Sequence, residues 1–157
     1  MQQHPAIPSL AGRQHTIAVL KDFRAQTRAE AGTRAYMWGV SALLDDATIG
    51  GRADFYAEQA PATGQAGGNA AQLASGRRIF SQGFPARGVI ACVSCHGDAA
   101  EGAAGFPRLA GQQARYPNAQ LQIFGSKLRP HGVVMKNELR QMKPAEMRAV
   151  AAYLQSL

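Results

Sequence analysis

Apolar side chains near the end of the sequence recur at the spacing of a helix, in which every third or fourth residue shares one face. This stripe consists of Met147, Val150, Ala151 and Leu154, which follow the i, i+3, i+4, i+7 pattern. Pro144 suits the first turn of such a helix, because a backbone N–H at that position would have no partner within the helix. The pattern therefore predicts an amphipathic helix from Pro144 towards the end of the chain.

A second helix is predicted from Leu73 through Phe80, ending near Gly83 with Pro85 beyond its end. The segment before it, residues 58–72, is rich in Ala, Gly, Pro and Gln, which is typical of a flexible linker. No run of alternating polar and apolar residues, the pattern of a half-buried strand, stands out in the sequence. The predicted fold class is therefore all-α.

Two parts of the chain repeat each other. Their common landmarks occur in the same order, and the matching pairs are 6–12 (AIPSLAG) with 105–111 (GFPRLAG), 20–23 with 121–124, Met37 with Met135, and Phe55 with Tyr153. Chance does not explain a shared order of this kind. We therefore expect three parts: a partial copy in residues 1–57, a linker in residues 58–72 and a complete domain in residues 73–157.

The motif that carries chemistry is Cys92-Val93-Ser94-Cys95-His96, which contains both cysteines of the chain. Two thiols at this spacing can each add to one vinyl group of a protoporphyrin, and the adjoining histidine then lies beneath the iron. A thioredoxin-like pair would need a preceding strand, and a disulfide between residues three apart is strained. A zinc site would need further ligands close by, and the next histidine is His131. The motif therefore predicts covalent haem attachment.

The net charge of +7 comes entirely from residues 63–157, which carry eleven Lys and Arg against four acids, whereas residues 1–62 carry six of each. A field of this sign steers encounter with an acidic partner, although scattered cations also simply solubilise a surface. The basic residues do not cluster with aromatics and no nucleic-acid motif is present, so we expect no binding to nucleic acid. No transmembrane run or signal peptide is visible.

Residues 70–157 resemble the class I cytochromes c, and more closely the bacterial two-lobed, diheme cytochrome c-four-like group. The matching residues are Gly76, Phe80, Cys92, Cys95-His96-Gly97, Phe106-Pro107, Leu109-Ala110-Gly111-Gln112, Met135 and Tyr153-Leu154. The resemblance implies a class I cytochrome c fold in this lobe, with Gly76 at a close helix crossing. It also implies that His96 is the proximal iron ligand, that the Pro107 carbonyl accepts the other ring N–H of His96, and that Met135 is the distal ligand.

The residues themselves favour Met135 as the sixth ligand. Met142 and Met147 lie where a helical stripe would bury them, whereas Met135 is expected in a loop ahead of the last helix, where it can reach over a cofactor. A thioether favours ferrous iron and raises the reduction potential. His131 is the rival ligand, and a bis-histidine iron would have a lower potential.

The first copy departs from the pattern, because an equivalent Cys-x-x-Cys-His would end just before Met1. We expect the sequence to be the tail of a longer two-haem protein in which Met37 is the distal ligand of the first haem. The alternative is that Met37, beside Trp38, is a core residue of a degenerate lobe. Residues 1–57 are expected to pack poorly or to lean on the second lobe, and Gly50-Gly51 to weaken their last helix. The remaining histidines, His4 and His15, are expected at the surface.

Iron held by six ligands has no open site for a substrate, so the resemblance implies an electron carrier and no enzyme. We expect one covalent haem c in a periplasmic protein that carries electrons from a quinol-oxidising complex to a terminal oxidase or reductase. The alternative is a dedicated cytochrome c subunit of a membrane-associated dehydrogenase or oxidase complex. A ligand-binding or peroxidase-like haem protein is a third hypothesis, and it requires a vacant sixth position. The periplasm follows from haem attachment outside the inner membrane, and the missing leader is then expected upstream.

Overall fold

The computed structural model describes residues 7–12, 16–29, 34–103 and 105–157, so His4 and His15 lie outside the described residues. Within these ranges the chain forms helices and two isolated β-bridges, and the predicted all-α class is confirmed. The helices are α1 (Thr16–Arg24), α2 (Arg34–Ala42), α3 (Asp46–Glu58), α4 (Ala70–Gln82), the 3-10 turn η1 (Pro85–Arg87), α5 (Val93–His96), α6 (Arg115–Phe124), α7 (Val133–Leu139) and α8 (Pro144–Gln155).

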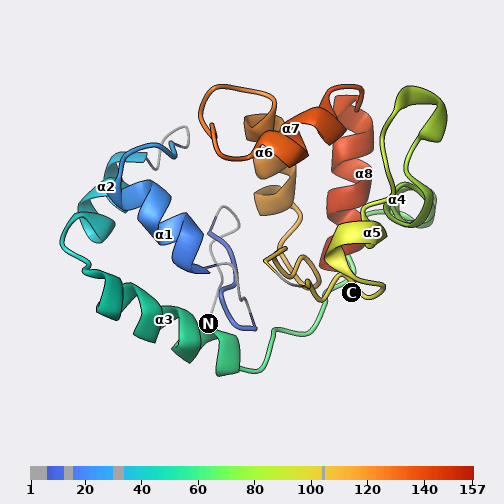
Figure 1. Cartoon of the computed structure of the whole chain (residues 1–157). Coiled ribbons are helices and arrows are strands. Elements are labelled where there is room, and N and C mark those ends of the chain that lie inside the picture. Colours follow the sequence, from blue (N-terminus) through green and yellow to red (C-terminus); the bar gives the residue numbers. More distant parts are fainter. Residues whose placement is uncertain (1–6, 13–15, 30–33, 104) are drawn as a thin grey trace.

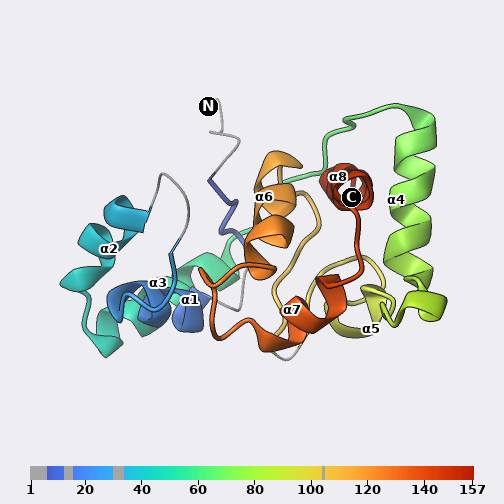
Figure 2. The same ribbon diagram turned by 90° about the horizontal axis from the view of Figure 1, so that it is seen from above.

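The helices form two lobes that lie side by side. Figure 1 shows α1, α2 and α3 on one side of the molecule and α4 to α8 on the other. Seen from above in Figure 2, α6 stands at the side of the second lobe that faces the first. The loop after α6 continues this boundary, because the backbone N–H of Ala29 donates to the Leu128 carbonyl over 2.8 Å. The second lobe contains the haem motif and is built around one helix crossing.

That crossing joins α4 and α8, both predicted from the sequence. Helix α8 begins at Pro144, as the sequence indicated, and the Glu146 carboxylate accepts from the Lys143 N–H just before it. Gly76 lies directly against the α8 backbone at Ala149, so the missing side chain allows the two helices to approach closely. Next to this contact, the Phe80 and Tyr153 rings pack 5.7 Å apart. The crossing buries apolar side chains of both helices, among them Phe80, Val150 and Leu154, in the core of the second lobe.

The first lobe is a smaller packing of α1 against α2 and α3. Asp45 caps α3 by accepting from the Thr48 N–H over 2.7 Å, and Ile49 is fully buried beneath it. Phe55, the counterpart of Tyr153 in the repeat, is 58% exposed, and Leu43 is 94% exposed. This lobe therefore buries fewer of its apolar side chains than the second lobe and contacts the second lobe along one side.

The predicted linker, residues 58–72, contacts the end of α8 at Gln65. The Gln65 N–H donates to the Gln155 carbonyl over 2.8 Å, and the Gln155 amide returns a bond to the Gln65 carbonyl. Helix α4 begins at Ala70, earlier than the predicted Leu73, because the Asn69 side chain accepts from the backbone and acts as its N-cap. The middle of the connection is therefore hydrogen-bonded to the second lobe.

Candidate haem site

His96 is the centre of the site and ends the short helix α5. Its ring is only 5% exposed, and its Nδ1 lies 3.0 Å from the carbonyl oxygen of Pro107. Because a carbonyl can only accept, Nδ1 carries the hydrogen and Nε2 keeps a free lone pair. Nε2 is buried and has no hydrogen-bond partner within the protein. The Phe106 ring packs edge-on against the His96 ring, with 5.9 Å between the ring centroids.

The protonation state of this imidazole suits metal binding. Burial lowers the pKa of His96, and the hydrogen bond to Pro107 opposes this effect only in part. The ring is therefore neutral near pH 7, with its lone pair on Nε2 directed away from Pro107. A neutral imidazole whose other nitrogen donates to a carbonyl is the usual form of a histidine metal ligand.

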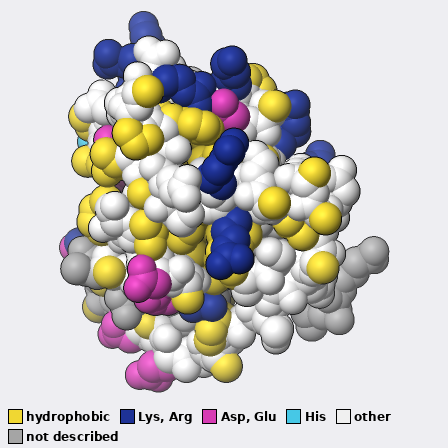
Figure 3. Space-filling view, turned by 90° about the vertical axis from the view of Figure 1, so that its right-hand side faces the viewer, with side chains coloured by type: hydrophobic (Ala, Val, Ile, Leu, Met, Phe, Trp, Pro, Cys, Tyr) yellow, Lys and Arg dark blue, Asp and Glu magenta, His cyan; other side chains and the backbone are white. Residues whose placement is uncertain are grey.

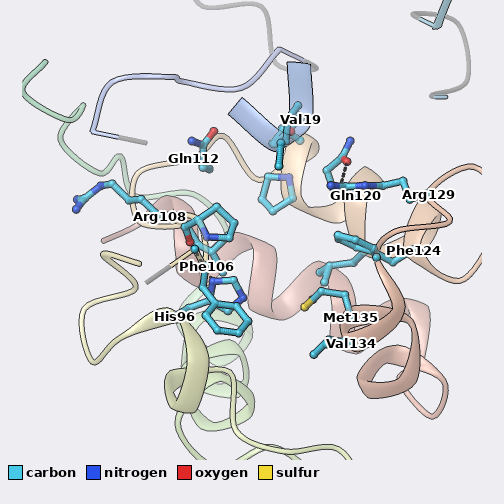
Figure 4. Close-up of a pocket in the computed structure, with 18 of the residues that line it drawn as sticks. Val19, His96, Phe106, Arg108, Gln112, Gln120, Phe124, Arg129, Val134 and Met135 are labelled. Atoms are coloured by element: carbon cyan, nitrogen blue, oxygen red, sulfur yellow. Dashed lines mark hydrogen bonds between the residues drawn. The ribbon is translucent and has the colours of Figure 1, made fainter. Parts of the chain in front are cut away.

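His96 lines a cavity of about 460 Å³, which is within the size range of cofactor pockets. Figure 4 shows His96 on one wall and Met135 on another, with the methionine sulfur directed into the space between them. Most of the lining is apolar and includes Phe106, Leu109, Leu121, Phe124 and Val134. The charged and amide side chains in the lining are Asp22, Arg108, Gln112, Gln120, Arg129 and His131.

The two cysteines lie at a second, smaller cavity of about 60 Å³, which also contacts His96 and Met135. Both thiols are free and only partly exposed. Burial raises the pKa of the Cys92 thiol to about 11, so it stays protonated at neutral pH. The structure therefore brings the motif cysteines, His96, Pro107 and Met135 around two cavities that share His96 and Met135 in their linings.

Met135 lies on helix α7 (Val133–Leu139) and not in the loop predicted for it. The sequence between Pro130 and Pro144 offers only a short apolar run, so a helix of seven residues leaves little periodicity to detect. Met142 and Met147 are buried in the core, in agreement with the prediction. Met135 alone among these three methionines lines the larger cavity.

His131 and Met37 have other surroundings. His131 is exposed, and its Nδ1 lies 2.8 Å from an Asp22 carboxylate oxygen of the first lobe. Met37 lies on α2, lines neither cavity, and accepts a hydrogen bond from Ser41 through its carbonyl. Of the candidate sixth ligands, Met135 is the one whose side chain faces the His96 cavity without an ion pair to another residue.

Sequence reasoning missed the role of Gln112, which was noted only as part of a motif. This side chain is 3% exposed, donates to the Ser9 carbonyl over 2.7 Å and accepts from the Ser9 N–H over 3.0 Å. It therefore joins the first lobe to the cavity wall. The match between 6–12 and 105–111 was visible in the sequence, but contact between the two segments was not.

The space, the neutral imidazole and the paired thiols fit a haem, and the helix crossing is that of a class I cytochrome c. Comparison with known proteins agrees. The family model described as "Cytochrome c" matches residues 73–157, and the chain belongs to the cytochrome c family. None of the helices in the described part of the chain is long and apolar enough to cross a bilayer.

Individual relatives narrow this class. The chain is 37% identical to the cytochrome c-552 of Acidithiobacillus ferridurans over 98% of its own length and 67% of that protein. It is 43% identical to the thiosulfate dehydrogenase electron acceptor of Stutzerimonas stutzeri over 55% of its length and 41% of that protein. The solved cytochrome c4 of Acidithiobacillus ferrooxidans superposes with a TM-score of 0.90 at 37% identity, covering 99% of this chain and 91% of that one.

The chain is therefore a two-lobed protein similar to cytochrome c4, and its family carries covalently bound haem c. It is an electron-transfer protein and not an enzyme, as the sequence predicted.

Proposed function

We propose that this chain carries one electron at a time on a haem c joined to Cys92 and Cys95, with His96 and Met135 as the axial iron ligands. The observation that carries the proposal is the bare, buried Nε2 of His96, which faces a cavity lined by the Met135 thioether. Leaving such a nitrogen unpaired costs about 1–3 kcal/mol unless a ligand binds it. Coordination to a haem iron would use the lone pair of this nitrogen.

Each side chain then has a definite task. Pro107 accepts the Nδ1–H of His96 and so fixes both the tautomer and the orientation of the ring. Met135 supplies a soft, neutral donor that favours the reduced state. Haem c, when bound, supplies the one-electron couple. Leu121 and Phe124 exclude water from the cavity and so limit the reorganisation that accompanies a change of charge.

The surface next to the thiols supports docking of a redox partner. Ile90, Val133 and Val134 are about half exposed there, and Lys136 on α7 and Arg140 just after it are also exposed. Figure 3 shows Lys and Arg side chains over the upper and middle parts of the side that carries α4, with acidic groups mainly at the lower edge. An apolar contact rimmed by cations fits a partner with an acidic docking surface.

For the compartment and partners, we propose a periplasmic carrier between a quinol-oxidising complex and a terminal oxidase or reductase. Covalent haem attachment outside the inner membrane supports the periplasm. The test is to produce the protein with haem-maturation machinery and to compare it with a C92S/C95S variant on a denaturing gel. Haem should remain with the parent protein and be lost from the variant. Haem retained by the variant would contradict the attachment.

A second candidate is a dedicated electron-accepting subunit of a dehydrogenase. It is favoured by the relative named as a thiosulfate dehydrogenase electron acceptor. The test is to mix the oxidised protein with a thiosulfate dehydrogenase and its substrate, and to follow haem reduction. Rapid, saturable reduction together with co-purification would support the subunit. Reduction by a quinol-oxidising complex alone would support the general carrier.

A further inference from the structure

Glu138 joins helix α7 to a segment far from it in the sequence. It lies three residues after Met135, about one turn further along the same helix, so both residues occupy one side of α7. Its Oε2 accepts a hydrogen bond from the backbone N–H of Ile90 over 3.0 Å. Because Ile90 lies two residues before Cys92, this bond joins the helix that carries Met135 to the segment that leads into the cysteine motif.

The residues on both sides of this hydrogen bond line one cavity. Ile90, Cys92, Met135 and Glu138 all border the smaller cavity, which also contacts His96. Figure 4 shows that His96 and Met135 reach the site from different elements of the lobe. The bond from Glu138 to Ile90 therefore spans the border of the cavity, from the side of Met135 to the side of Cys92.

The segment that donates to Glu138 is firmly held, whereas α7 has few attachments. Val89, next to Ile90, is 3% exposed and exchanges two backbone hydrogen bonds with Phe84, over 2.8 and 3.2 Å. In the part of the chain that the structure describes, no other hydrogen bond joins α7 to a segment distant in the sequence. Leu139 buries the apolar side of this short helix in the core. The position of α7 therefore depends on that packing and on the Glu138 bond.

The first copy of the repeat has no equivalent carboxylate. The alignment that places Met37 opposite Met135 places Val40 opposite Glu138. A valine side chain cannot accept a hydrogen bond, so this attachment is not a general feature of the repeat. It belongs to the lobe that contains the cysteine motif.

We propose that Glu138 is a positioning residue for Met135, because its bond to Ile90 holds α7 where the thioether can bind the haem iron. This inference rests on the proposed function, since it requires Met135 as the sixth ligand. When Met135 leaves the iron, an external ligand such as imidazole can take its place. Imidazole binds only this open state, so its apparent affinity rises in proportion to the open fraction. A bond that holds α7 in place keeps that fraction small.

Glu138→Ala removes the acceptor and should raise the open fraction. One hydrogen bond shifts such an equilibrium by about fivefold, so imidazole should bind the oxidised holoprotein about five times more tightly. Glu138→Gln keeps an oxygen that can accept from Ile90, and its affinity should stay within about twofold of the parent protein. The control is Asn137→Ala, which shortens an exposed neighbour on the same helix and should also stay within about twofold.

The test is an imidazole titration of the oxidised parent holoprotein, E138A, E138Q and N137A, followed by the loss of the methionine–iron charge-transfer band. The proposal expects tighter binding in E138A alone. Equal affinities in E138A and N137A would overturn it. Equal affinities in E138A and E138Q, both different from that of the parent protein, would assign the effect to the lost charge and would also overturn it.

A double substitution tests whether Glu138 acts through Met135. In a Met135→Ala protein the sixth position is already open, so adding Glu138→Ala should change the imidazole affinity by less than about twofold. A fivefold effect that persisted in this background would show that Glu138 obstructs the entry of imidazole directly. The positioning role would then be wrong.

The parent protein distinguishes failure of this inference from failure of the proposed function. It must retain haem on a denaturing gel and show the methionine–iron band when oxidised. If either is absent, the ligand assignment is wrong, and the role of Glu138 is wrong with it. If both are present and E138A behaves like N137A, the ligand assignment stands and only the positioning role of Glu138 is wrong.

Discussion

Replacing Gly76 by alanine tests the helix crossing that supports the haem site. A Cβ at this position would lie 2.7 Å from the Tyr153 Cβ and closer still to the Ala149 carbonyl oxygen of α8. Backbone cannot move aside as a side-chain end can, so α4 and α8 must separate. Overpacking of this kind costs about 1–3 kcal/mol, with the upper end expected here, and the better helix propensity of alanine returns about 1 kcal/mol.

The expected net loss is about 2 kcal/mol of unfolding free energy, or a melting temperature lower by about 4–8 °C. Gly51→Ala is the matched control, because Gly51 also lies inside a helix but a Cβ there meets nothing within 4 Å. That variant should be more stable by up to about 1 kcal/mol. Thermal unfolding of both holoproteins, followed by far-ultraviolet circular dichroism, should show a lower melting temperature for Gly76→Ala and a higher one for Gly51→Ala. A Gly76→Ala protein as stable as Gly51→Ala would refute the close crossing.

Three further changes test other parts of the molecule. Met135→Ala should lower the reduction potential and let the reduced protein bind carbon monoxide at neutral pH; unchanged spectra would rule out ligation by this residue. Although desolvation raises it, the N-cap hydrogen bond and the ion pair with Arg87 (2.9 Å) hold the pKa of Glu146 below 4.5. Glu146→Gln should thus cost about 0.5 kcal/mol at pH 7, and chemical unfolding should show this difference vanishing as the pH falls through that lowered pKa. Gln112→Leu removes both bonds to Ser9 and should destabilise the lobe contact by about 1–2 kcal/mol, measured as faster proteolysis between the lobes.

The sequence predicted the elements whose signals are local. The stripe from Met147 to Leu154 and the proline at its start located α8, and the cysteine motif pointed to the family that the comparisons confirm. Met135 lines the His96 cavity, and its role as the sixth ligand stays a prediction. Its helix was missed because seven residues give too few turns to show a period.

Features that depend on tertiary contact were beyond the sequence. The composition of residues 58–72 predicted a flexible linker, but it gave no sign that Gln65 bonds to Gln155 of α8. The interval from Phe23 to Arg28 and from Phe124 to Arg129 was open to inspection in the repeat. This interval did not predict that Arg28 and Arg129 would both donate to the side-chain oxygen of Gln120, because that depends on how the lobes pack.

Arg28 and Arg129, which match in the repeat, both donate to the side-chain oxygen of Gln120. In an isologous homodimer, every residue at the interface occurs twice, so a glutamine at one side requires the same glutamine at the other. Here the counterpart of Gln120 in the first copy is Val19, since the equivalent arginines, 28 and 129, fix the alignment. Within one polypeptide the two positions can differ, as glutamine and valine do here. One carboxamide now serves both arginines, an arrangement that a symmetric pair of identical lobes does not permit.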